Sequence, residues 1–67
     1  MDFEVTNHGS IVLIAPLTQD ADNWLDENIG DDAMYMGSAL AVEPRYAGNI
    51  IAGMLNDGLT SNVELAA

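Results

Sequence analysis

The sequence predicts an α+β fold, a small sandwich with the element order ββαβα in which two helices cover one face of a three-stranded, mainly antiparallel sheet. Two segments with apolar residues, separated by an Asn-His-Gly-Ser turn, predict a hairpin near the start of the chain. Two later segments have apolar residues at helical spacing, with start and stop signals at their ends. With 67 residues, the chain is expected to form a single domain, residues 1–67, that buries only about 60% of the surface of the unfolded chain.

The first hairpin is predicted from residues 2–6, which alternate polar and apolar side chains as a half-buried strand does. Asn7–Ser10 is interpreted as the turn, because Asn and Gly tolerate positive φ. The following run, Ile11–Ile14, is continuously apolar, which is typical of a strand at the centre of a sheet or covered on both faces. Pro16 lacks a backbone N–H and is expected to close this strand.

The first helix is predicted between Thr18, a favourable N-cap residue, and Gly30, which suits a left-handed stop. Asp20 and Asp22 fall in the first turn, where the helix dipole favours negative charge. One face of this helix carries the apolar residues Ala21, Trp24, Leu25 and Ile29. We therefore expect Trp24 to lie in the core.

Residues 33–42 are interpreted as the third strand. Their Ala, Leu and Met residues are also compatible with a helix, but the Gly37-Ser38 pair and the hairpin upstream favour a strand. In one continuous strand, Ala39 and Ala41 would share a face that lets a helix approach closely. Met34 and Tyr35, at the start of this strand, are better candidates than Trp24 for contact with a partner protein.

The second helix is predicted from Pro44, which suits the first helical position, to Gly58, which suits a left-handed end with Leu59 folding back on the last turn. Its apolar stripe consists of Tyr46, Ala47, Ile50, Ile51, Met54, Leu55 and Leu59. Gly53 lies beside this stripe, where close packing would justify a glycine. Residues 60–67 are expected to add an edge strand or to form a loose tail.

The charge of the chain is strongly unbalanced: eleven acidic residues stand against the single base Arg45, for a net charge of −10. Such a chain repels nucleic acids and anionic membranes and attracts basic surfaces. An alternative explanation is that the acidic residues only keep the protein soluble. A surface with that role alone, however, usually carries both acidic and basic residues. The absence of Cys excludes disulfides and thiolate chemistry and, with no apolar run long enough to span a membrane and no signal peptide, favours the cytoplasm.

The residues that could carry chemistry are few. His8 and Ser10 lie in the predicted turn, whereas a catalytic Ser-His pair needs an orienting acid, an oxyanion hole and a pocket, so we expect no enzyme activity. A calcium loop needs an oxygen ligand and a glycine at the positions that Trp24 and Leu25 occupy, so we expect neither a metal nor another cofactor. Arg45 is expected to pair with Glu43 or with a carboxylate of the acidic segment.

Two stretches, NHGSIVLIAP (7–16) and GSALAVEPRYAGNIIAGMLNDGL (37–59), carry an Asn-His-Gly-Ser turn and an Ala-Leu-x-Val-Glu-x-Arg-Tyr strand-to-helix junction. In these stretches, about half the chain, the sequence resembles a group of small proteins from phages and mobile elements of proteobacteria. In size and charge it resembles the anti-CRISPR proteins of such elements, including inhibitors of type I (I-C) systems. The resemblance implies that the protein acts in the cytoplasm of a host bacterial cell and that its partner is a subunit of a Cas effector complex.

The acidic segment from Thr18 to residue 32 has a specific interpretation. Phosphates on one DNA strand recur with each base, at about 3.4 Å of rise, and carboxylates four residues apart on a helix lie roughly 6 Å apart. The leading hypothesis is therefore a DNA mimic that blocks a basic DNA-binding surface without binding nucleic acid itself. The expected contact residues are Asp20, Asp22, Asp26, Glu27, Asp31, Asp32 and Tyr35. The alternative is a homodimeric interaction or accessory module that assembles through Tyr35 and the sheet edge.

Overall fold

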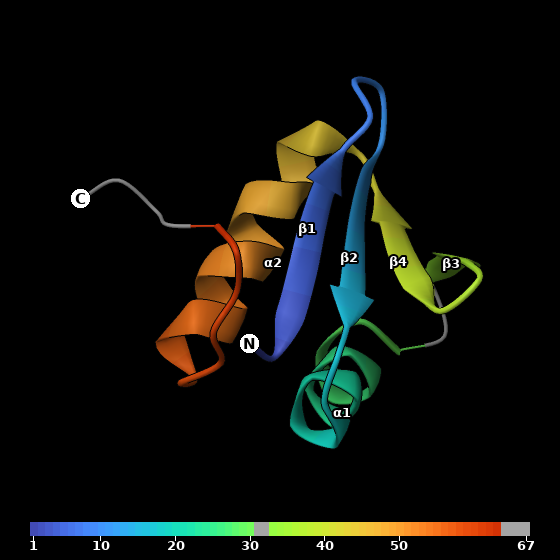
Figure 1. Cartoon of the computed structure of the whole chain (residues 1–67). Helices are drawn as coiled ribbons and strands as arrows, with labels where there is room; N and C mark the ends of the chain where they lie inside the picture. Colours follow the sequence, from blue (N-terminus) through green and yellow to red (C-terminus); the bar gives the residue numbers. More distant parts are fainter. Residues whose placement is uncertain (31–32, 64–67) are drawn as a thin grey trace.

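The computed structural model describes residues 1–30 and 33–63 and shows a four-stranded antiparallel sheet with two helices (Figure 1). The elements are β1 (Phe3–Asn7), β2 (Val12–Pro16), α1 (Gln19–Asn28), β3 (Met34–Met36), β4 (Ala39–Val42) and α2 (Pro44–Asn56). The strands lie in the order β1-β2-β4-β3. The predicted α+β class is confirmed, whereas the prediction of three strands is wrong.

The additional strand arises because the segment predicted as one strand, 33–42, folds into a hairpin at Gly37-Ser38. Met36 pairs with Ala39 across a two-residue turn whose first position, Gly37, has φ +65°. A positive φ at this position alone is the pattern of a type II′ turn, which matches the twist of the flanking strands. The two residues that disfavoured a helix therefore also interrupt the strand.

The β3–β4 hairpin also changes which side chains share a face. Tyr35 pairs with Leu40 and so points to the side of the sheet that carries the core. Ala39 and Ala41 point to the other side, so the expectation that they let a helix approach is wrong. The helices instead pack on Leu40 and its neighbours in the core.

The first hairpin follows the prediction with its boundaries moved by one or two residues. Asn7 still belongs to β1 and pairs with Val12, so the connection is His8–Ile11. Gly9 has φ +83°, and its N–H donates to the Asn7 Oδ1 at 2.8 Å. The strand β2 occupies the interior of the sheet, between β1 and β4, as its apolar sequence predicts.

The ends of both helices follow the predicted signals. The Thr18 Oγ1 accepts the N–H of Ala21 at 3.3 Å, and Gly30 follows α1 with φ +71°. After α2, Gly58 has φ +93° and donates to the carbonyl of Leu55, while Leu59 donates to that of Met54. This pair of bonds is a Schellman motif, and Leu59 folds back onto the core.

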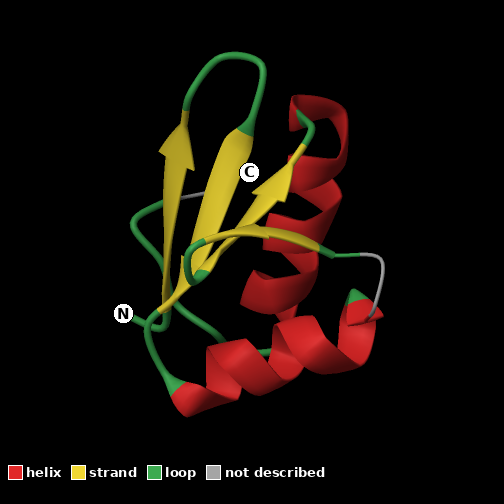
Figure 2. Cartoon of the chain, turned by 90° about the vertical axis from the view of Figure 1, so that its right-hand side faces the viewer, coloured by secondary structure: helices red, strands yellow, loops and turns green. Residues whose placement is uncertain are grey.

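The core lies between the sheet and the helices. Its buried side chains are Phe3, Val12, Ile14, Ala21, Leu25, Leu40, Ala47, Ile51 and Met54. In Figure 2, α2 runs along one face of the sheet and α1 lies across its lower end. Tyr46, predicted in the apolar stripe of α2, is instead exposed by 51%, although its neighbour Ala47 is buried.

The two helices meet where α2 ends. Trp24 is half-buried against the core, and its ring approaches Gly53 so closely that a Cβ there would lie 3.0 Å from Cζ2. The indole N–H of Trp24 donates to the Asp57 carboxylate just after α2. The prediction of close packing at Gly53 is confirmed, whereas Trp24, predicted in the core, is only partly buried and packs against it.

The segment after α2 returns along the outer edge of β1. Ser61 forms a parallel bridge with Phe3, and the Asn62 side chain bonds to the N–H and the carbonyl of Val5, at 2.8 and 3.0 Å. Residues 60–63 thus protect this edge without forming a strand. The remainder of the predicted tail, residues 64–67, lies outside the described residues.

Candidate functional site

The acidic residues of α1 form two stripes rather than one row. Asp22 and Asp26, four residues apart, share one side of the helix, and we call them the β3-side pair. Asp20 and Glu27, seven residues apart, share another side next to Trp24, which contacts α2, and we call them the α2-side pair. All four are exposed. Between the stripes lie Gln19 and Asn23, whose side chains hydrogen-bond at 3.0 Å.

The β3-side pair faces Tyr35 of the neighbouring strand. The pKa of Tyr35 is raised above its ordinary value, chiefly by burial and then by the negative charges of Asp26 and Asp22. Since Tyr35 lies on the helix side of the sheet, the structure brings together three of the residues predicted for the site. The other predicted residues of α1, Asp20 and Glu27, point elsewhere.

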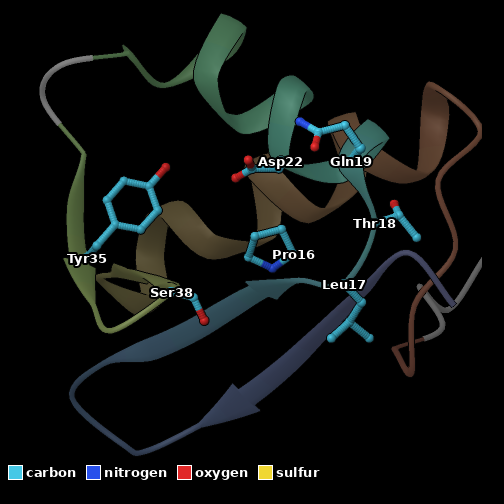
Figure 3. Close-up of a pocket in the computed structure, with 7 residues that line it drawn as sticks. All are labelled: Pro16, Leu17, Thr18, Gln19, Asp22, Tyr35 and Ser38. Atoms are coloured by element: carbon cyan, nitrogen blue, oxygen red, sulfur yellow. The ribbon is translucent and has the colours of Figure 1, made fainter.

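A shallow hollow lies between α1 and the β3–β4 turn, and Asp22 and Tyr35 are on its two sides (Figure 3). It is lined by Pro16, Leu17, Thr18, Gln19, Asp22, Tyr35 and Ser38. The Asp22 carboxylate points toward the side on which Tyr35 stands (Figure 3). A tyrosine ring beside a carboxylate suits a cationic side chain, which gains from the charge and from the face of the ring.

Sequence reasoning missed most of this hollow. Pro16 ends β2, Gln19 begins α1 and Ser38 lies in the turn before β4, so only the folded chain brings them together. The one local signal was the Gly37-Ser38 pair, which as a turn signal would have placed Ser38 beside the end of β3.

The single base of the chain does not neutralise these acids. The Arg45 Nε lies 2.9 Å from the Glu43 Oε2, and the guanidinium lies 4.8 Å from the centre of the Tyr46 ring. Of the two partners expected for Arg45, the structure therefore shows Glu43. Both residues lie at the start of α2, at the end of the molecule opposite α1 (Figure 1). No salt bridge to α1 occurs within 1–30 and 33–63.

The other predicted residues add little to the site. Asp31 and Asp32 lie outside the described residues. His8 is exposed at the tip of the first hairpin. Within the part of the chain that the structure describes, no three His, Asp or Glu residues are placed to hold a metal ion, and no helix has the length and apolar character needed to cross a membrane.

Comparison of the chain with protein-family models, with curated proteins and with solved structures finds no match in any of the three.

Proposed function

We propose that the protein is a non-catalytic inhibitor that binds a basic, nucleic-acid-binding surface of a host protein complex and excludes DNA from it. The observation that carries the proposal is the β3-side pair beside Tyr35, exposed and without a basic partner among the described residues. Isolated surface acids are common, but here two carboxylates, an aromatic ring and a hollow coincide.

The contact begins with long-range attraction. A net charge of −10 concentrated on a domain of 67 residues accelerates encounter with a cationic surface. The carboxylates of Asp22 and Asp26, roughly 6 Å apart along the helix, then receive Lys or Arg side chains that otherwise hold phosphates. The protein gains the salt-dependent part of DNA binding and makes no use of base recognition.

The hollow would hold a cationic side chain of the partner in a defined position. An Arg or Lys of the partner that enters beside Asp22 meets the ring of Tyr35 and the hydroxyl-bearing Ser38 on the opposite side. The α2-side pair provides a second, separate set of charges. The inhibitor thus contacts its partner mainly through the side of α1 that faces β3.

The resemblance of segments 7–16 and 37–59 to small proteins of mobile elements points to a Cas effector subunit as the partner. The direct test uses a purified type I-C effector complex and a labelled target duplex. The protein should displace the duplex at low salt and lose this ability steeply as salt rises toward physiological strength, since exposed charges are then screened.

Charge reversal identifies the surface. The double variant Asp22→Lys/Asp26→Lys should weaken displacement by about tenfold or more. The matched control, Asp20→Lys/Glu27→Lys, makes the same change in net charge on the α2-side pair and should weaken it distinctly less. Equal losses in both variants would mean that only net charge matters. Undiminished inhibition by the first variant, with its circular dichroism unchanged, would refute the proposal.

A further inference from the structure

The face of the sheet opposite the core departs from the pattern of a solvated surface. An antiparallel sheet with one wet face normally places polar residues there, and β1 does so with Glu4 and Thr6. The other three strands do not. Their residues on this face are Leu13 and Ala15, Ala39 and Ala41, and Met34 and Met36. We call this apolar area, across β2, β4 and β3, the open face.

Met34 and Met36 are its most exposed members, at 69% and 58%. The described part of the chain places no helix over this face, as the side view shows (Figure 2).

The open face has a ridge and a furrow. The methionines of β3 stand along one side, Ile11 and Leu13 along the other, and the small alanines of β4 lie between them. Two hollows border this face. One is lined by His8, Ser10, Ile11, Leu13 and Met36, and the other by Ile11, Met34, Ala41, Val42, Glu43 and Tyr46. Under two-fold rotation, the flexible methionines of one copy can pack onto the small alanines of the other.

Charge decides which partner suits this face. Among the described acids, Glu4 lies on this side on β1, and Glu43 lines the hollow beside Met34, where it is paired with Arg45. The acids of α1 lie on the other side of the sheet. A basic partner would therefore find little negative charge among the described residues of this side, because Glu4 lies on the neighbouring strand β1 and Glu43 is already paired with Arg45. We propose that it packs against the open face of a second copy, forming a symmetric dimer with the two α1 helices turned outward.

Pairing of two copies through the β3 edge is less favourable. It would bring together two Tyr35 residues and, next to them, the Asp22 and Asp26 carboxylates of both copies. β3 also offers only three residues for pairing. Packing through the open face avoids both costs, because the sheet separates the acids of one copy from those of the other.

The available surface area limits the strength of this dimer. A standard interface takes about 800 Å² from each partner, close to a fifth of the 4345 Å² surface of this molecule. One side of a two-layer domain supplies at most an area of this order, and the copies repel each other through their net charge. The dimer should therefore be weak and reversible, and added salt should strengthen it.

The first experiment measures the mass of the isolated protein by sedimentation equilibrium over a wide range of concentration, at low and high salt. A monomer–dimer equilibrium that shifts toward dimer with salt is expected. Met36→Glu should abolish it, while Asn23→Glu, which adds the same charge on the exposed side of α1, away from the open face, should change the dissociation constant less than about threefold. A monomer under all conditions overturns the proposal, and so does a dimer that persists in Met36→Glu.

The second experiment needs no variant. Initial rates of methionine oxidation by hydrogen peroxide should fall for Met34 and Met36 as protein concentration rises, because the interface covers them. Met1, exposed by 62% and outside the open face, is the internal control and should not change. Unchanged rates at Met34 and Met36 would refute this interface. Neither experiment involves DNA or a host complex. A negative result would therefore refute the dimer without bearing on the proposed inhibition.

Discussion

Gly53 is a residue at which the packing of α1 against α2 depends on the absence of a side chain. A Cβ at this position would lie 3.0 Å from Trp24 Cζ2 and 3.2 Å from Cη2. The ring has little room to retreat, because it is packed against the core and its N–H is bonded to Asp57.

The pair Gly53→Ala and Gly48→Ala tests this packing. Both changes remove a helical glycine of α2 and should gain about 1 kcal/mol in helix propensity, but a Cβ at Gly48 meets nothing within 4 Å. Gly48→Ala should therefore raise the free energy of unfolding, measured with urea, while overpacking at Gly53 costs about 1–3 kcal/mol and cancels or reverses the gain. Equal gains at both positions would contradict the close contact.

Asp2 joins three parts of the chain. Its carboxylate accepts the N–H of Thr60 at 2.9 Å and the hydroxyls of Thr60 and Thr18 at 3.1 and 3.0 Å. The backbone bond from Thr60 first, and then the Thr18 hydroxyl, hold the pKa of Asp2 below its ordinary value. The N-terminus, the cap of α1 and the segment after α2 thus meet at one anion.

The lowered pKa fixes the sign of the pH dependence. An unfolded Asp titrates at about 3.9, so the stabilisation from Asp2 is complete above that pH and disappears as pH falls through the lower folded value. Asp2→Asn should lower the urea midpoint at neutral pH, and this difference should shrink as the pH falls below the unfolded pKa of about 3.9. Glu4→Gln, with an exposed carboxylate on β1, is the control and should show a smaller difference at neutral pH.

At the scale of elements, the placement of α1 against β3 is what assembles the candidate site. It can be tested through the pKa of Tyr35, which burial raises most and the charges of Asp26 and Asp22 raise further. In Asp22→Asn/Asp26→Asn this pKa should fall but stay above the ordinary value. Asp20→Asn/Glu27→Gln removes the same number of charges from the α2-side pair and should move it much less.

The measurement is a titration of the Tyr35 ring carbon by NMR in a Tyr46→Phe background, so that one tyrosine is observed. Equal shifts in the two double variants would mean that α1 does not present the β3-side pair to Tyr35.

Features of these elements that depend on neighbouring residues are predictable from the sequence, whereas features that depend on pairing between segments are not. A few adjacent residues determine how each helix begins or ends. The sequence therefore predicts the N-cap at Thr18, the positive φ of Gly58 and the packing of Leu59 back onto the last turn of α2. The Gly37-Ser38 turn was missed because the same pair is compatible with a weak strand, and only the pairing of Met36 with Ala39 distinguishes the two.

The candidate site was predicted in part for the same reason. The composition of α1 identified the acids, and helical spacing predicts that Asp22 and Asp26 lie together. The β3–β4 hairpin, which the Gly37-Ser38 pair alone does not distinguish from a weak strand, turns Tyr35 toward them and adds Ser38 to the hollow.

At the scale of the whole molecule, the range of electrostatic forces compares directly with its size. The Cα atoms span 25 × 24 × 16 Å. The screening length is about 30 Å at 0.01 M salt and about 3 Å at 1 M. At low salt every carboxylate therefore repels every other across the domain, whereas at high salt only immediate neighbours interact.

Thermal stability should therefore increase with salt, because the folded state confines ten net negative charges more tightly than the unfolded chain does. The melting temperature, measured at protein concentrations too low for association, should rise as NaCl increases from about 0.01 M to about 1 M. In Asp22→Lys/Asp26→Lys each change adds two positive units, so the net charge falls from −10 to −6 and the dependence on salt should weaken. A melting temperature that does not change with salt in either protein would show that charge repulsion does not limit the stability of this fold. The acids of α1 would then be no different from those of an ordinary solvent-exposed surface.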